Sequence, residues 1–405
     1  MTKSQKFQLY DHPSQMEPML PSEHRLGPSL ERAHDLIRKA ERLAGWGPTG
    51  ALPGLRQLLR AMNSYYSNRI EGQHTLPQEI EQALRNDYAK DQDRARRQRL
   101  ALAHMQTEAQ LENLWPQWTT THVWAPQTVQ DIHQDLFARL PAEDLTYNPS
   151  LPALQPGVLR SQQVSVGRHA APDAQHLPVF IKRWSSVYGQ ARRGEMQVVG
   201  MACAHHRLAW IHPFLDGNGR VARLHSHLTL GHMGLTNGLW SPLRGFARTQ
   251  DTYYARLAAA DEPRAGDLDG RGNLSETALL DWVTYVIDTC IDQVDFMTQL
   301  LSLDDMKNRI TACLNYEQAV VRQGVRTDAL RALHYLFATQ SELDRADFKA
   351  MLGLGERLAT AQISALLKRG LLQSDTPHGK LRLGVPQHAL RFYFPKLWPE
   401  AEGVG

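Results

Sequence analysis

Cysteine is scarce in this sequence, which has only Cys203, Cys290 and Cys313 among its 405 residues. None of them has C-x-x-C spacing, and all stand in apolar segments with helical periodicity, so we expect reduced core thiols in a cytoplasmic protein. Long apolar runs are missing as well, because none approaches the ~20 residues that a membrane-spanning helix needs. The polar first ten residues lack the apolar stretch of a signal peptide, so no secretory signal is expected.

Neither sign of charge dominates, with 45 Lys and Arg against 42 Asp and Glu and a net charge of +3. Internal repeats and low-complexity segments are also absent. The length predicts two or three domains, and a hydrophobic content of 42% is enough for a sizeable core. Eighteen histidines raise the question of a metal site. However, His225 and His227 are two residues apart and would point to different sides of a helix, which argues against a shared ion.

The segment from residue 211 to residue 223, IHPFLDGNGRVAR, gathers groups of related chemistry. A glycine-rich turn that runs into a helix presents free backbone N–H groups at the positive end of the helix dipole, which binds anions. Arg220 and Arg223 share a helix face, so both can hold one polyphosphate. Asp216 offers the hard oxygen that a phosphate-bound Mg²⁺ needs, and His212 can accept a proton from a hydroxyl. Together these groups predict transfer of a nucleotide phosphate to an alcohol.

Two other nucleotide-binding motifs do not fit the sequence. Residues 217–222, GNGRVA, match the G-x-G-x-x-A dinucleotide fingerprint in form, but that fingerprint has to follow a β-strand. The preceding residues 198–211 have apolar side chains at helical spacing instead. A Walker sequence, G-x-x-x-x-G-K-[ST], does not occur in the chain.

The segment resembles the signature of the Fic family, His-Pro-Phe-x-Asp/Glu-Gly-Asn-Gly-Arg-x-x-Arg, at every fixed position, and His205 upstream also agrees with the family pattern. Most members are protein adenylyltransferases, which move AMP from ATP to a Ser, Thr or Tyr hydroxyl of a target protein. The resemblance therefore implies ATP and Mg²⁺ as cofactors, with Pro213 and Phe214 shaping the loop. The roles that it implies are a general base at His212, a Mg²⁺ ligand at Asp216, phosphate binding by Gly217, Asn218 and Gly219, and pairing of Arg220 and Arg223 with the β and γ phosphates.

A second match lies upstream, where residues 67–72, SNRIEG, resemble the inhibitory motif of the same family, [Ser/Thr]-x-x-x-Glu-[Gly/Asn]. Ser67 and Glu71 are four residues apart and share one face of a helix that Gly72 ends. A carboxylate at this place can fold onto Arg223 and keep it from the γ phosphate. On this resemblance we expect the chain to be autoinhibited by Glu71.

Residues 155–167 alternate apolar and polar side chains around Val164 and Val166, between a Pro-Gly pair and Gly167, as a short hairpin does. Fic proteins carry such a hairpin, called the flap, over the active site, where its unpaired edge positions the target backbone. Residues 252–257 resemble the helix that follows the catalytic helix in the family. Tyr254 in this stretch is a candidate nucleotide contact, and an ordinary core tyrosine is the alternative.

Residues 324–394 have the pattern of a separate module, with three helices followed by two short strands that a turn at residues 375–379 joins. This order resembles a winged helix. Ten Lys and Arg against six Asp and Glu give the stretch a net charge of +4. Local positive charge favours contact with DNA, but winged helices also dock proteins or form homodimers, so both alternatives stay open.

We therefore expect a mostly α protein, a Fic helical core with a β-hairpin flap and a C-terminal winged helix. A polar leader is expected over residues 1–28, and the charged residues 91–100 are expected to form a solvated helix face or connector. The expected parts are residues 1–115 with the inhibitory motif, 116–265 as the catalytic core, 266–323 as a helical connector, and 324–395 as a winged-helix-like domain.

The expected function is AMP transfer from Mg-ATP to a hydroxyl of an unidentified target protein, including self-modification, with no membrane partner. One alternative is removal of AMP at the same site, with Glu71 orienting a water molecule. Another is a winged-helix transcriptional regulator that uses the Fic site as a nucleotide sensor. A third is a metal-dependent phosphohydrolase built on the pair His34 and Asp35.

Overall fold

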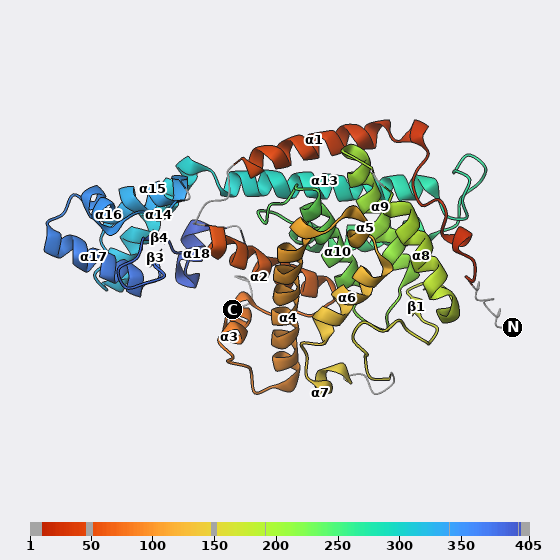
Figure 1. Ribbon diagram of the computed structural model, residues 1–405, viewed down its shortest axis with the longest axis horizontal. Helices are drawn as coiled ribbons and strands as arrows, with labels where there is room; N and C mark the ends of the chain where they lie inside the picture. The colour runs from red at the N-terminus through yellow and green to blue at the C-terminus, as the bar shows by residue number, and fades with distance from the viewer. Residues whose placement is uncertain are drawn as a thin grey trace. The chain divides into compact units, whose positions relative to one another are not determined.

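The computed structural model describes residues 10–45, 52–146, 152–190, 192–339, 341–395 and 397. Within these residues the fold is mostly α-helical, as the sequence predicted, with two small two-stranded sheets (Figure 1). No helix in the described part of the chain is both long and apolar enough to cross a membrane. Of the leader predicted over residues 1–28, residues 1–9 lie outside the described part, and the first long helix already begins at Gly27.

Residue contacts divide the chain into two compact units, residues 1–41 with 63–294 and residues 42–62 with 295–405. The division into four parts that the sequence suggested stays a prediction. In chain order the elements of the first unit are η1 (Pro13–Met16), η2 (Glu23–Arg25), α1 (Gly27–Ala44, up to Glu41), α2 (Leu52–Ile70, from Asn63), α3 (Pro77–Leu84), α4 (Gln92–Leu114), η3 (Trp115–Gln117), α5 (Thr120–Val123), α6 (Pro126–Phe137), α7 (Ala142–Leu145), β1 (Ser165–Val166), β2 (His169–Ala170), η4 (Ala174–His176), α8 (Leu177–Tyr188), α9 (Glu195–Ile211), α10 (Asn218–His232), α11 (Leu243–Arg248), α12 (Gln250–Asp261) and α13 (Glu276–Leu300, up to Val294).

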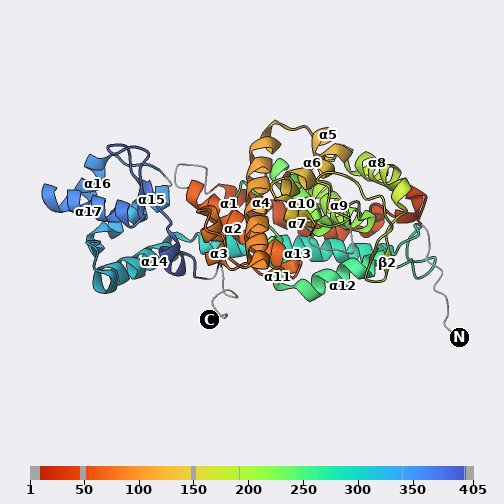
Figure 2. The ribbon, with the colours of Figure 1, turned by 90° about the horizontal axis from the view of Figure 1, so that it is seen from below.

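The core of the first unit is built around α9 and α10. Both helices carry small, apolar and histidine side chains on all faces, and such a helix is stable only when other elements surround it. α8 and α12 pack against α9, while α4, α5 and α6 pack against α10 (Figures 1 and 2). Trp184, Trp210 and Trp282 are fully buried here, and the Trp184 and Trp282 indoles donate to carbonyl oxygens of α9. The central helix pair is therefore fixed by packing on every side.

The charged residues 91–100 belong to the first turns of α4, a helix of 23 residues. Asp93 and Arg94 are exposed, as expected for a solvated helix face, whereas the uncharged Gln98 and Leu100 are buried. The helix packs against α3, α6 and α10, and two of its arginines pair with carboxylates of neighbouring elements. Arg99, for example, donates to both carboxylate oxygens of Asp144 over 2.6 and 2.7 Å. The pairing compensates the partial burial of Arg99 and of the Asp144 carboxylate.

The second unit contains a set of short helices and one hairpin. Its helices α15, α16 and α17 precede the antiparallel pair β3–β4, and an isolated bridge joins Leu343 to Leu381. The buried Glu317 carboxylate accepts two hydrogen bonds of 2.7 Å from Arg369. The winged-helix interpretation of this unit stays a prediction. The elements after residue 300 are α14 (Leu303–Tyr316), the π-helical turn η5 (Glu317–Val321), η6 (Thr327–Ala329), α15 (Leu330–Thr339), α16 (Arg345–Leu352), α17 (Glu356–Lys368), β3 (Leu372–Gln373), β4 (Arg382–Leu383) and α18 (Gln387–Tyr393).

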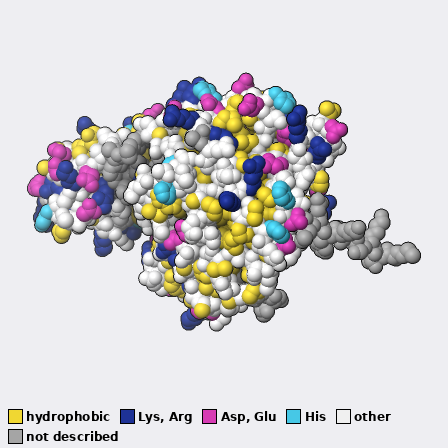
Figure 3. All heavy atoms as spheres, turned by 45° about the vertical axis from the view of Figure 1, so that its right-hand side comes forward, with side chains coloured by type: hydrophobic (Ala, Val, Ile, Leu, Met, Phe, Trp, Pro, Cys, Tyr) yellow, Lys and Arg dark blue, Asp and Glu magenta, His cyan; other side chains and the backbone are white. Residues whose placement is uncertain are grey.

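The molecular surface carries charges of both signs. On the face drawn in Figure 3, Lys and Arg side chains are interspersed with Asp and Glu side chains and with apolar groups. This mixture agrees with the small net charge of +3. The face shown offers no broad field of one sign that would steer a highly charged partner to it.

Candidate active site

The predicted motif forms the turn between α9 and α10, which pack against each other. α9 ends because His212 adopts the left-handed conformation, with φ 49° and ψ 61°. The chain then turns and enters α10 after Gly217, which has φ 83°. This positive φ favours glycine at position 217. A Cβ atom there would also clash with Phe137, because it would lie 2.4 Å from Phe137 Cε2. The motif sequence thus builds the close turn that leads into a helix N-terminus.

Asn218 and His133 hold this turn in shape. The Asn218 side chain accepts a hydrogen bond from Phe214 N over 2.9 Å and donates to Phe214 O over 2.8 Å. His133 of α6 stacks on the Phe214 ring, with centroids 3.9 Å apart. Its Nδ1 accepts from Gly157 N over 2.8 Å, so Nε2 carries the proton and donates to Asp216 O over 3.2 Å. The Asn218 side chain is therefore occupied, which leaves its backbone N–H for an anion.

Arg220 and Arg223 lie buried on the side of α10 that meets the end of α2. Arg223 Nε donates to Ser67 Oγ over 3.0 Å, and its Nη2 donates to Ser67 O over 3.0 Å and to Glu71 Oε1 over 2.6 Å. Arg220 Nε donates to Asn68 Oδ1 over 3.1 Å. The structure therefore brings the upstream motif and the motif arginines together. The Asn68 contact was not predicted, because this amide lies at a variable position of the motif.

The Glu71 carboxylate lies against the first turn of α10. A Cβ atom on Gly219 would lie 2.3 Å from Glu71 Oε1. Burial by itself would raise the pKa of Glu71, but Arg223 and Arg220 outweigh burial and hold this pKa below its usual value. The carboxylate is thus ionised at neutral pH, and it lies at the positive helix end that favours anionic groups.

The motif imidazole is kept neutral by its surroundings. Burial lowers the pKa of His212 to about 4, and the Arg160 guanidinium acts in the same direction. An imidazole with this pKa is unprotonated at neutral pH, and one of its ring nitrogens can accept a proton. This is the state that a general base requires.

Arg160 joins the motif turn to the hairpin segment, and no pattern around it in the sequence marked it. Its side chain is buried, and Nε donates to His212 O over 2.8 Å. Nη1 donates to Gln162 O over 2.7 Å and Nη2 to Pro172 O over 2.6 Å, on the two sides of the hairpin. The Arg160 backbone N also donates to Pro213 O over 2.9 Å. One residue therefore fixes the His212 backbone relative to the hairpin.

The hairpin forms around Gly167, whereas the sequence analysis ended it there. β1 pairs with β2 through the partners Ser165 with Ala170 and Val166 with His169, and Ala171 N donates to Val164 O over 3.1 Å. The Pro-Gly pair at residues 156–157 makes a separate turn, because Gly157 takes φ 78° to reach His133. Within the described residues this sheet has two strands, so β1 and β2 each keep one open edge. Val166 is 46% exposed on β1.

Asp216 lies just before α10 with 29% of its side chain exposed. Its Oδ1 accepts from Gly217 N over 2.6 Å and lies 3.9 Å from Arg220 Nη1. Mg²⁺ in nucleotide sites takes most of its ligands from phosphates and water and one or two from carboxylates. A partly exposed carboxylate beside an anion-binding helix end fits this requirement, so Asp216 is the residue that would hold the ion.

The two neighbouring tyrosines of α12 have different places. Tyr254 is 43% exposed, so it is not a core residue, and its hydroxyl donates to Ile70 O at the end of α2 over 2.7 Å. Tyr253 is buried, and its hydroxyl lies 2.9 Å from His205 Nε2. His205 Nδ1 lies 2.8 Å from Ser226 Oγ of α10. His205 therefore links α9, α10 and α12 inside the core, away from the motif turn.

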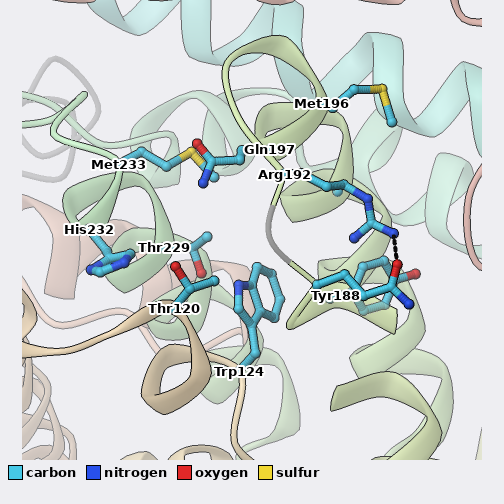
Figure 4. A pocket seen from close by; sticks show the side chains of 11 residues that line it. Thr120, Trp124, Tyr188, Arg192, Met196, Gln197, Thr229, His232 and Met233 are labelled. Carbon is cyan, nitrogen blue, oxygen red and sulfur yellow. Dashed lines mark hydrogen bonds between the residues drawn. The ribbon is translucent and has the colours of Figure 1, made fainter. Parts of the chain in front are cut away.

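A small cavity lies among α5, α8, α9 and α10, and no residue of the motif turn lines it (Figure 4). Trp124, Tyr188 and Met196 contribute to its wall, and Arg192 Nη2 donates to Gln190 Oε1 over 3.2 Å beside it. Its volume is about 20 Å³, which suits one water molecule. Small-molecule sites usually measure about 300–1,000 Å³, so this cavity is not the nucleotide site.

The sequence model described as "Fic/DOC family" matches residues 123–230, which contain α6, the hairpin and the motif turn. The protein adenylyltransferase Fic of Drosophila ananassae is 32% identical over 110 residues, which cover 27% of this chain and 21% of that protein. The protein of the same name from Drosophila virilis is 31% identical over 110 residues, covering 27% and 22%. The chain thus spans about a fifth of the length of these curated relatives.

Among solved structures, a Fic family protein from Desulfovibrio desulfuricans G20 is similar with a TM-score of 0.52 and 18% identity, over 89% of this chain and 97% of that one. At this identity the likeness concerns the fold, which is the helical Fic fold with its small sheets. Residues 123–230 therefore match the Fic/DOC family model, and the fold of the chain resembles that of a solved Fic family protein.

Proposed function

We propose that this protein transfers AMP from Mg-ATP to a Ser, Thr or Tyr hydroxyl of a target protein, and that Glu71 restrains the transfer. One observation carries the proposal: a neutral His212, the α10 N-terminus and the pair of Arg223 with Glu71 surround a single turn. The adenylyltransferase names of the relatives agree with this chemistry.

In the proposed reaction the target hydroxyl oxygen attacks the α-phosphorus of ATP. The bond from the α-phosphorus to the bridging oxygen breaks, pyrophosphate leaves, and the hydroxyl proton passes to the His212 imidazole. Arg220, Arg223 and the N–H groups of the first α10 turn neutralise charge on the phosphates and on the leaving pyrophosphate. A Mg²⁺ ion held by Asp216 would add positive charge at the phosphates. The open edge of β1 would align the target backbone by strand addition.

Inhibition follows from competition for one arginine. Glu71 and the γ phosphate both require Arg223, and the Glu71 carboxylate lies where the first turn of α10 would receive a phosphate. ATP bound beside Glu71 would therefore lack one of its cationic partners and align poorly for attack. Tyr254 supports the inhibited state in this proposal, because its hydroxyl holds the last carbonyl of α2.

A label-transfer assay tests the proposal. The wild type, Glu71→Gly, and Glu71→Gly combined with His212→Ala are each incubated with cell lysate, Mg²⁺ and ATP labelled at the α-phosphate. We expect protein-bound label with Glu71→Gly, little with the wild type and none with the double variant. ATP labelled at the γ-phosphate is the control, and it should label protein equally with all three variants, because kinases of the lysate transfer this phosphate. Absence of α-label on any protein with Glu71→Gly would overturn the proposal.

The ionised carboxylate inside the site supports one second candidate, removal of AMP by water that Glu71 orients. Wild-type protein added to an AMP-labelled target would then release the label, and Glu71→Gly would not.

We also propose a cytoplasmic location for the protein. The second unit is proposed to dock the target protein, DNA or a second copy of the chain.

A further inference from the structure

A cluster of buried polar side chains lies between α4 and α10, apart from the motif turn. Glu108 and Glu112 of α4 and His227 of α10 each offer one ligand atom, and these atoms all lie within 4.8 Å of one another. His227 Nε2 is 3.7 Å from Glu108 Oε1 and 3.4 Å from Glu112 Oε1. His227 and Glu108 are almost inaccessible to solvent, and the Glu112 side chain is 10% exposed.

These separations suit a shared cation better than direct hydrogen bonds. Charge-assisted hydrogen bonds from nitrogen to a carboxylate oxygen measure about 2.7–2.9 Å. Around a tetrahedral zinc ion, with bonds of about 2.0–2.2 Å, ligand atoms lie about 3.3–3.6 Å apart. A divalent ion between the two carboxylates would also lower the repulsion between them.

A second observation points to the same place. His104 of α4 is fully buried, and its Nδ1 lies 3.8 Å from Glu108 Oε2, the oxygen that does not face His227. Neither ring nitrogen of His104 has a hydrogen-bond partner within the part of the chain that the structure describes. A buried imidazole without a partner is costly unless something outside the protein chain satisfies it. His104, Glu108 and Glu112 stand at four-residue intervals on one face of α4, so they present their donors together.

We propose that Glu108, Glu112 and His227 bind one divalent transition-metal ion of the zinc type, with His104 beside the second oxygen of Glu108. Mixed imidazole and carboxylate ligands are typical of zinc in proteins. The ligands come from two helices, so the ion would tie α4 to α10 one turn beyond Arg223. Asn63 of α2 donates to Glu108 Oε1 over 2.7 Å and orients that carboxylate. This site is separate from the Mg²⁺ position proposed at Asp216 and does not depend on AMP transfer.

Equilibrium dialysis of the full chain against ZnCl₂, followed by elemental analysis, tests the proposal. After removal of metal with a chelator, we expect the wild type to take up one zinc ion per chain. Glu112→Gln and His227→Gln should each weaken uptake by more than about 100-fold, because loss of a supporting partner alone costs about 10- to 100-fold. Asn63→Ala should weaken zinc uptake by about 10- to 100-fold, because Asn63 only supports the Glu108 ligand. Asp216→Asn should retain the ion, which separates this site from the Mg²⁺ position.

Two exposed residues provide matched controls, His24→Gln for an imidazole and Asp93→Asn for a carboxylate on α4. Both should bind zinc like the wild type. Circular dichroism checks that each variant is folded, and Glu112→Gln keeps the size of the side chain if His227→Gln fails to fold. A wild type that takes up no zinc, or equal uptake by the wild type and a folded Glu112→Gln, would overturn the proposal.

Discussion

Arg223 Nη2 donates to Glu71 Oε1 over 2.6 Å and to Ser67 O over 3.0 Å, so one buried guanidinium holds both a side chain and the backbone of the upstream motif. The arginine cannot make these contacts and receive a phosphate with the same donors. Loss of the Glu71 carboxylate therefore frees a donor that already points along α10 toward the anion-binding end.

Glu71→Gly should raise the rate of label transfer by about 5- to 150-fold, the usual range for coupling between two sites. Combining it with Arg223→Ala should remove the gain, because the freed arginine is then missing. Rates of self-labelling at fixed Mg-ATP measure both effects. His74→Gly, an exposed position of the same segment, is the control and should change nothing. Equal rates for the wild type and Glu71→Gly would show that residues 67–72 are only a helix end.

His212→Ala, made in the Glu71→Gly background, should lower transfer by about 10²–10⁴-fold, the usual cost of losing a general base. Binding of ATP should stay within a few-fold, since the α10 N-terminus and the arginines hold the nucleotide. Labelling rates and calorimetric titration with ATP measure the two quantities separately. Unchanged labelling would remove His212 from the proposed mechanism.

Arg160→Ala should reduce the transfer rate by about 10- to 100-fold without a comparable loss of ATP affinity. The physical reason is positional: the guanidinium fixes the His212 carbonyl, and a displacement of about 1 Å at a reacting group costs up to about 100-fold. Arg160→Lys should recover part of the rate through a single donor. Arg168→Ala, on the exposed hairpin turn, is the control. If ATP affinity falls as much as the rate, Arg160 acts on the nucleotide and not on His212.

Acid should destabilise the fold as the pH falls from 6.5 toward 4. Burial lowers the pKa of His133, His212 and His225 to about 4 in the folded state, whereas unfolded histidines bind protons near pH 6.5. Below pH 6.5 the unfolded state therefore binds more protons, and the free energy of unfolding decreases with falling pH. Thermal denaturation between pH 4.5 and 8 measures this dependence. His133→Gln should show a weaker dependence, and an identical slope would contradict the assignment for His133.

Removal of the chain after Gln323 should preserve self-labelling, because the proposed catalytic and inhibitory residues lie between Ser67 and Tyr254. The truncated protein should nevertheless lose the transition of the second unit in thermal denaturation. In the full chain α14 packs against α15 and α18, which the truncation removes. The buried Glu317 would also lose both hydrogen bonds from Arg369. Arg369→Ala in the full chain is the milder test and should lower only that transition. Loss of label transfer in a folded truncated protein would place the second unit in the active site.

The sequence predicted those site residues that belong to short motifs with fixed spacing. One example is the pair of helices that flank the motif turn. Another is the contact of Glu71 with Arg223, because each of these residues occupies a fixed position of its motif. Arg160 and His133 escaped prediction since their roles arise from hydrogen bonds to carbonyl and N–H groups far along the chain. Backbone partners leave no trace in side-chain patterns.

Two further differences between the predicted and the observed structure also arise from contacts between residues far apart in the sequence. The hairpin was placed too early because Pro156-Gly157 is a turn signal, but this turn serves the contact with His133. Among the many histidines, a shared metal ion was considered only for His225 and His227, which lie on one helix. The ligand candidates that accompany His227 are Glu108 and Glu112 of α4, which lie more than 100 residues away in the sequence.

The left-handed backbone of His212 has a consequence for how this fold can lose its activity. Histidine and asparagine both tolerate this conformation, while most residues with larger or branched side chains do not. A chain with His212→Asn would therefore keep the turn, the α10 N-terminus and both arginines, and would lose only the proton acceptor. On the proposed function such a chain would hold ATP without consuming it, so a single substitution separates a nucleotide-binding pseudoenzyme from the enzyme.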